Sequence, residues 1–240
     1  PVPRGVGASS APAFNMQAYM AGYSALKKTT AASLRIDANS LSEIVDMLSL
    51  EKQNELEKII LAKSNSPSQV VVGFNRRFSP HISKIKSLVT ESAPKNMVAT
   101  MNAGYIPENV WVHDMEVGGG RIIGEACHYL DLLRFISGSD ISAICMNALG
   151  SNPAENTDNA SILVKFENGD NGVINYFANG NKSYSKERLE VYFDEKTIVM
   201  DNFRKTKAYG IKGFSSLKTK LDKGHNEQFK KVMENSQNGG

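Results

Sequence analysis

Cysteine is scarce in this chain of 240 residues, which contains only Cys127 and Cys145. The sequence has no Cys-x-x-Cys pair, no cluster of Cys and His, and no His-Glu-x-x-His. It therefore lacks the common zinc-binding patterns, and we expect no metal site. Both cysteines lie in apolar runs, so we interpret them as small buried thiols, which suit a reducing compartment.

Long apolar runs and a strong excess of charge are also missing. No run approaches the roughly 20 apolar residues that a membrane helix needs, and the N-terminus lacks the charged-then-apolar pattern of a signal peptide. We therefore expect a cytoplasmic protein with no membrane partner. The 28 basic and 25 acidic residues leave a net charge of +3. That balance argues against nucleic acid as a partner.

The second half of the chain is rich in alternating or β-branched runs. The pattern predicts a buried strand over residues 70–74 and a helix that Ser79 caps and Pro80 begins. Further helices are predicted over 51–63, 121–136 and 226–235. Strands are predicted at 97–101, 141–149, 160–166, 172–177, 188–193, 197–200 and 205–209. Turn residues at 167–172 and 194–196 indicate hairpins. The predicted fold class is α+β, with an open, mostly antiparallel sheet and helices on one face.

A glycine-rich loop at residues 118–120 leads into the helix with the most informative polar residues. Glu125, His128 and Asp131 are spaced i, i+3, i+6, which keeps them roughly on one side of about two helical turns. A histidine between two carboxylates gains basicity and a fixed orientation, as a general acid/base for hydroxyl–ketone interconversion requires. The same spacing also fits a charge network on a helix surface.

Three motifs follow one another along the chain. They are Gly73-Phe74-Asn75-Arg76-Arg77-Phe78-Ser79-Pro80, the glycine loop with Glu125, His128 and Asp131, and Lys223-Gly224-His225. Together they resemble the Gfo/Idh/MocA oxidoreductases. The resemblance runs from about Leu56 to Gly240. It implies a Rossmann domain followed by an open antiparallel sheet that forms the substrate pocket and often the oligomer interface.

The resemblance also implies a reaction, namely reversible hydride transfer between NAD or NADP and a carbinol carbon of a sugar, nucleotide sugar or cyclitol. His128 matches the family's substrate-hydroxyl histidine. The family usually has an Asp four positions earlier, where this chain has Gly124, with Glu125 next to it. We expect His128 as the acid/base, with Glu125 and Asp131 as its modulators.

Further substrate contacts are expected on two segments. Asn75, Arg76 and Arg77 match the family's motif at the entrance to the sheet domain. A guanidinium at this place either binds sugar hydroxyls or phosphates bidentately or locks the domain seam. On the opposite loop, Tyr105, Trp111 and His113 either contact a sugar or fold onto the sheet.

The cofactor half is incomplete in this sequence. Gly5 and Gly7 form a Gly-x-Gly pair with no apolar strand before it, and they are the candidate cofactor-binding residues. Where the family has Glu-Lys-Pro, the chain reads Asp46-Met47-Leu48. We expect residues 1–68 to be a partial or degenerate Rossmann-like region and residues 69–240 to be the substrate-binding and oligomerisation domain.

The predicted function is an NAD(P)-dependent oxidoreductase in its full-length form, with a sugar-like small-molecule substrate and self-association through the open sheet. The sequence is then either part of a longer protein or a truncation. The alternative is a non-catalytic sugar-binding or assembly module that has lost the cofactor half. Saturable binding of NAD or NADP to the chain distinguishes the two.

Overall fold

A computed structural model describes residues 58–66 and 71–237 of the chain. The chain divides into two units, with residues 58–66 in the first and 71–237 in the second. Residues 58–64 are helical, in agreement with the predicted helix as far as the described residues reach. The predictions for Gly5, Gly7 and the remainder of 1–57 lie outside the described residues.

An eight-stranded open sheet forms the centre of the second unit, in the order β2-β3-β4-β1-β5-β6-β7-β8. The strands are β1 (Asn96–Asn102), β2 (Ile141–Ala148), β3 (Asn159–Phe166), β4 (Asn171–Phe177), β5 (Glu187–Phe193), β6 (Lys196–Asp201), β7 (Lys205–Tyr209) and β8 (Ser216–Lys218). Neighbouring strands are antiparallel except β1 and β4, which run parallel. The predicted open, mostly antiparallel sheet is confirmed.

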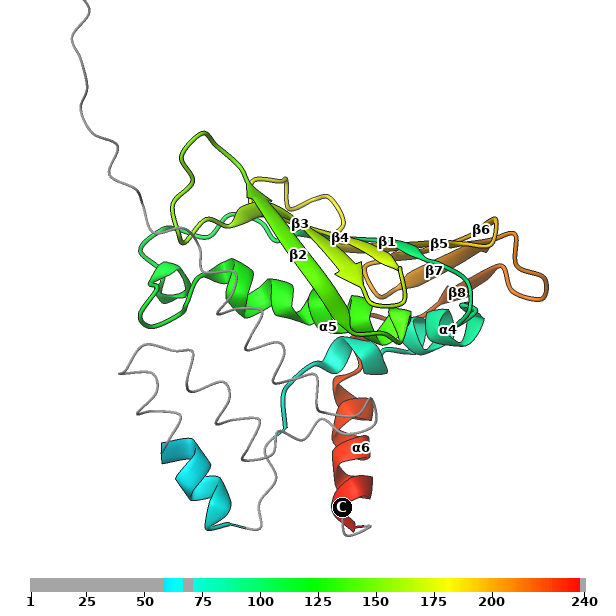
Figure 1. Cartoon of the computed structure of the whole chain (residues 1–240), viewed down its shortest axis with the longest axis horizontal. Coiled ribbons are helices and arrows are strands. Elements are labelled where there is room, and N and C mark those ends of the chain that lie inside the picture. The colour runs from blue at the N-terminus through cyan, green and yellow to red at the C-terminus, as the bar shows by residue number, and fades with distance from the viewer. Residues whose placement is uncertain (1–57, 67–70, 238–240) are drawn as a thin grey trace, which may run out of the picture. The chain divides into compact units, whose positions relative to one another are not determined.

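The helices are α4 (Pro80–Leu88), α5 (Cys127–Ser137) and α6 (His225–Gln237), with short 3-10 turns η1 (Asn75–Phe78) and η2 (Trp111–His113). Figure 1 shows α4 and α5 lying along one face of the sheet, while α6 points away from it on the same side. Ser79 caps α4 by accepting a hydrogen bond from the His81 amide, and Pro80 is its first residue, as predicted. Gly138 ends α5 in the left-handed region at φ 75°, a conformation that glycine adopts without strain.

Alternation of side chains along each strand separates a buried face from an open one. On β3, Ile162, Val164 and Phe166 are buried, while Leu163 between them is 55% exposed. The buried face packs beneath α4 and α5, whose Ile85 and Leu133 have no exposed surface. Burying each such side chain contributes roughly 1.5–3 kcal/mol, so the helices and the sheet hold each other in place.

Local turn chemistry sets the hairpins. Asp194 and Glu195 have φ of 45° and 56° between β5 and β6, the left-handed pair that a two-residue hairpin turn needs. Gly169 has φ 91° between β3 and β4. Both predicted hairpins are confirmed.

The predicted strand over residues 70–74 and the predicted burial of Cys145 are wrong. Residues 72–74 are not a strand, because their backbone closes on itself: the Phe74 amide donates to Val72 O and the Asn75 amide donates to Gly73 O, at 2.9 Å each. Cys145 is exposed rather than buried, because it lies on β2 at the edge of the sheet. Within the described ranges, no helix has the length and hydropathy that a membrane span requires.

Candidate functional site

Three of the sequence motifs meet around one carboxylate, Glu187, the first residue of β5. Its side chain has no exposed surface. Oε2 accepts hydrogen bonds from Arg76 Nε at 3.0 Å and from the Tyr129 hydroxyl at 2.6 Å, and Oε1 accepts one from Lys223 Nζ. The three donors come from η1, from α5 and from the loop before α6. One buried carboxylate therefore joins segments that are far apart in sequence.

The electrostatics of Glu187 favour its charged form. Burial by itself raises the pKa of Glu187, but the charge of Arg76 and the hydrogen bonds from Lys223 and Tyr129 hold it below its ordinary value. The Arg76 guanidinium also lies over the Tyr129 ring at 5.3 Å from the centroid, a favourable cation–π geometry. Burial, and then the charge of Glu187, raise the pKa of Tyr129, which keeps its proton.

His128 lies in the first turn of α5, beside this cluster. Its ring is half-buried and meets the Phe74 ring edge to face, with centroids 5.6 Å apart. Burial, followed by the charges of Arg76, Lys223 and His225, lowers the pKa of His128 to about 4, although Glu187 acts in the opposite direction. The imidazole is therefore neutral at neutral pH.

One nitrogen of this imidazole is left without a partner. Nδ1 of His128 is buried and has no hydrogen-bond partner among the described residues. Leaving a buried polar atom unpaired costs about 1–3 kcal/mol.

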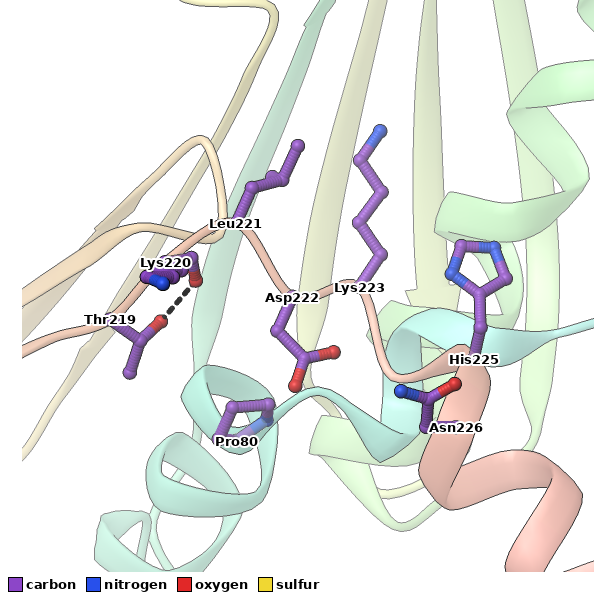
Figure 2. A pocket seen from close by; sticks show the side chains of 8 residues that line it. All are labelled: Pro80, Thr219, Lys220, Leu221, Asp222, Lys223, His225 and Asn226. Atoms are coloured by element: carbon purple, nitrogen blue, oxygen red, sulfur yellow. Dashed lines mark hydrogen bonds between the residues drawn. The ribbon is translucent and has the colours of Figure 1, made fainter.

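The Lys223-Gly224-His225 segment packs tightly against η1. Asn75 Nδ2 donates to Lys223 O at 2.7 Å, and Gly224 has φ +87° with backbone atoms of Phe78 and Ser79 at 2.5 Å from where a Cβ would stand. A pocket of about 410 Å³ opens beside this segment. Figure 2 shows the Lys223 and His225 side chains pointing to one side of the loop, while Asp222 points toward Pro80.

Asp131 lies in a different environment from the one its spacing suggests. Its carboxylate is buried and accepts from Arg77, at 3.0 Å between Nε and Oδ2 and in a second hydrogen bond between NH2 and Oδ1. Arg77 also lies over the Phe135 ring at 5.3 Å. Asp131 is therefore engaged with Arg77, and the carboxylate that acts most strongly on His128 is Glu187.

The Glu125 side chain lies in a second polar cluster, away from Glu187 and its donors. Its carboxylate pairs with Arg121 at 3.4 Å, and Arg121 also donates to Gly104 O at 2.9 Å and to Asp158 at 3.1 Å. Burial, and then the charge of Glu125, raise the pKa of Tyr176. The reason for this placement is a π-helical turn at Ile122–Ala126. Such a turn holds more residues than an α-helical turn, so the spacing argument for Glu125 and His128, which assumed an α-helix, does not hold.

The remaining predicted substrate residues divide between buried and exposed positions. Arg76 and Arg77 both form buried ion pairs, with Glu187 and Asp131, and these pairs join elements within the second unit. Tyr105 and Trp111 are 64% and 65% exposed, whereas His113 is buried. In the part of the chain that the structure covers, no hydrogen bond or ring contact links these three loop residues to His128.

Sequence reasoning missed Glu187, although the strand pattern contained a signal. Counting back from the buried Leu189, Val191 and Phe193 by steps of two places Glu187 on the inward face of β5. A charged residue on the buried side of an alternating strand requires a partner. That requirement would have identified Glu187 as a candidate.

A dinucleotide cofactor needs a site for its pyrophosphate. The described ranges contain no Gly-x-Gly-x-x-Gly turn, which is the usual seat of the pyrophosphate at a helix N-terminus.

Residues 92–199 match the model of the GFO/IDH/MocA C-terminal domain. An uncharacterised oxidoreductase, YrbE, of Bacillus subtilis is 31% identical over 140 residues, which are 56% of this chain and 41% of that protein. Myo-inositol 2-dehydrogenase of Thermotoga maritima is 24% identical over 159 residues, covering 63% of this chain and 47% of that enzyme. The chain thus spans less than half the length of these curated relatives.

Solved structures share the fold at low sequence identity. An oxidoreductase from Thermotoga maritima superposes with a TM-score of 0.57 at 19% identity, over 88% of this chain and 67% of that one. A levoglucosan dehydrogenase in complex with NADH and levoglucosan gives a TM-score of 0.53 at 15% identity, over 79% of this chain and 60% of that one.

Proposed function

Because this chain belongs to the Gfo/Idh/MocA oxidoreductases, we propose that the protein in its full length transfers hydride between NAD or NADP and a CH–OH group of a sugar, nucleotide sugar or cyclitol. The domain at residues 71–237 would hold the substrate. The names of the relatives support this class, since they include an inositol dehydrogenase and a levoglucosan dehydrogenase.

The observation that carries the proposal is the neutral His128 with its buried, unpartnered Nδ1. A neutral imidazole accepts the hydroxyl proton as an alcohol becomes a carbonyl, and returns it in the reverse direction. The nicotinamide, when bound, supplies or takes up the hydride. The edge of Phe74 and the buried cluster around Glu187 keep the imidazole in a fixed place and away from bulk water.

The decisive experiment replaces His128 in the full-length protein. His128→Ala removes the proton acceptor, and His128→Gln keeps a polar side chain that does not titrate. Both should lower hydride transfer by about 10²–10⁴-fold, measured from the absorbance of the reduced nicotinamide. Cys145→Ser, an exposed thiol on the edge strand, is the matched control. Near-normal turnover in the folded His128 variants would refute the role of His128.

Cofactor binding is tested separately, by calorimetric titration of NAD and NADP into the full-length protein. Saturable binding of one of them supports the proposal. Failure of both to bind the folded full-length protein would contradict it and would favour a binding or assembly module. The same titration on the 240-residue chain shows whether this part alone suffices.

We also propose that the open face of the sheet mediates self-association. Leu163, Phe177 and Tyr192 are 55%, 37% and 39% exposed on β3, β4 and β5. Packing a second copy of the protein against this apolar face would remove it from water, which is favourable. Light scattering after size-exclusion chromatography should give a multiple of the monomer mass, and Leu163→Asp should reduce it. A monomer at every concentration would exclude the assembly.

A further inference from the structure

We propose that Glu187 is a positioning residue of the His128 site: its carboxylate assembles Arg76, Tyr129 and Lys223, from three separate segments, around the imidazole. This inference rests on the proposed function of His128. Glu187 lies on β5 and outside every motif that marks the family resemblance. Its three donors are separated from it by 111, 58 and 36 residues along the chain.

The geometry leaves Glu187 little freedom. Both carboxylate oxygens are used, Oε2 by two donors and Oε1 by one, and the side chain is completely buried. Tyr129 is likewise buried, and the Lys223 side chain is 22% exposed. An ion cluster with this number of hydrogen bonds is strongly oriented, so each partner is fixed relative to the others.

The charges explain why a carboxylate is needed. Arg76 and Lys223 are two cations brought to one acid, and without it they would repel each other in a region of low dielectric. Glu187 is thus the group that allows both cations to remain beside His128. Asn75 and Gly224 reinforce the arrangement, because they fix η1 against the Lys223 backbone.

The charged groups that act most strongly on the imidazole come from four segments of the chain. Arg76 lies on η1, Glu187 on β5, Lys223 on the loop and His225 at the start of α6, and the cations lower the pKa of His128 while Glu187 raises it. The positioning residue therefore has two effects. It holds the cations in place, and it partly offsets their influence on the neutral imidazole.

The test follows His128 by NMR titration of its imidazole in the 240-residue chain, with the signal assigned by its loss in His128→Gln. Lys223→Gln removes one cation and should raise the pKa of His128 by about one pH unit, toward 6.5. Glu187→Gln keeps the shape of the side chain but removes the anion that holds Lys223, so in this background Lys223→Gln should change the pKa of His128 by less than it does in the wild type. Lys220→Gln, an exposed lysine on the same loop, is the control and should leave the pKa of His128 unchanged.

The result that overturns the inference is a His128 signal that titrates identically in the wild type, Lys223→Gln and Lys220→Gln. If Glu187→Gln does not fold, the Lys223→Gln arm decides by itself. In the full-length protein, Glu187→Gln should lower kcat at least tenfold with a smaller change in KM, and Glu187→Asp should restore part of it. If the pKa of His128 responds to Lys223→Gln but the His128→Ala enzyme remains active, only the proposed function is refuted. If the His128→Ala enzyme is inactive but the pKa of His128 does not respond to Lys223→Gln, only the role of Glu187 is refuted.

Discussion

Gly224 offers the sharpest test of how the site is assembled. A Cβ at this position would stand 2.5 Å from Phe78 C and from Ser79 N, and closer still to Asn75 O. All three are backbone atoms of η1 and its end, so no side-chain rotation relieves the overlap. Gly224→Ala therefore forces the loop that carries Lys223 away from η1.

The cost of this substitution has two parts. The left-handed conformation, at φ +87°, disfavours alanine by roughly 1–2 kcal/mol, and the steric overlap adds about 1–3 kcal/mol. Gly213 provides a comparison that distinguishes the conformational cost from the steric cost, because it has φ +80° with open space around its Cβ position. Gly213→Ala should show the first part alone.

The assay is urea denaturation of both variants and the wild type, followed by circular dichroism. Gly224→Ala should lose more unfolding free energy than Gly213→Ala by about 1–3 kcal/mol. It should also weaken the link from Asn75 to Lys223, and therefore lower activity in the full-length protein while Gly213→Ala retains it. Equal destabilisation by the two variants would refute the close packing of the loop on η1.

Two further predictions concern buried charge. His128 has a pKa of about 4, below its ordinary 6.5, so the unfolded state binds the proton first and the unfolding free energy falls as the pH drops from 6.5 through 4. The loss of unfolding free energy is at most ~3 kcal/mol, and solvent screening of the half-buried ring reduces this loss to about 1–2 kcal/mol. The difference between wild type and His128→Gln in urea denaturation at pH 7 and pH 4.5 measures it, and identical pH dependence would contradict it. Asp131→Ala leaves Arg77 buried without its partner, and thermal or urea unfolding should show a loss of about 3–5 kcal/mol; a loss below 1 kcal/mol would mean that water reaches the pair.

The site shows where reasoning from sequence stops. The three motifs lie together in the structure, because Arg76, Tyr129 and Lys223 all donate hydrogen bonds to Glu187. The partners within the site were not predictable from spacing. Asp131 pairs with Arg77, 54 residues away, and the π-helical turn at Ile122–Ala126 changes the direction of Glu125. Both outcomes depend on packing against distant segments.

The sequence by itself determined the features that depend on neighbouring residues. The Ser79 cap, the left-handed turn between β5 and β6, the Gly138 end of α5 and the alternation along β3 all follow from local backbone preferences and from side-chain period. Strand order was decided only by the tertiary structure, since the parallel pairing of β1 with β4 joins strands 75 residues apart. So was the meeting of Arg76, Tyr129 and Lys223 on Glu187, because a buried carboxylate takes whichever donors the fold brings within reach, and no local pattern encodes those donors.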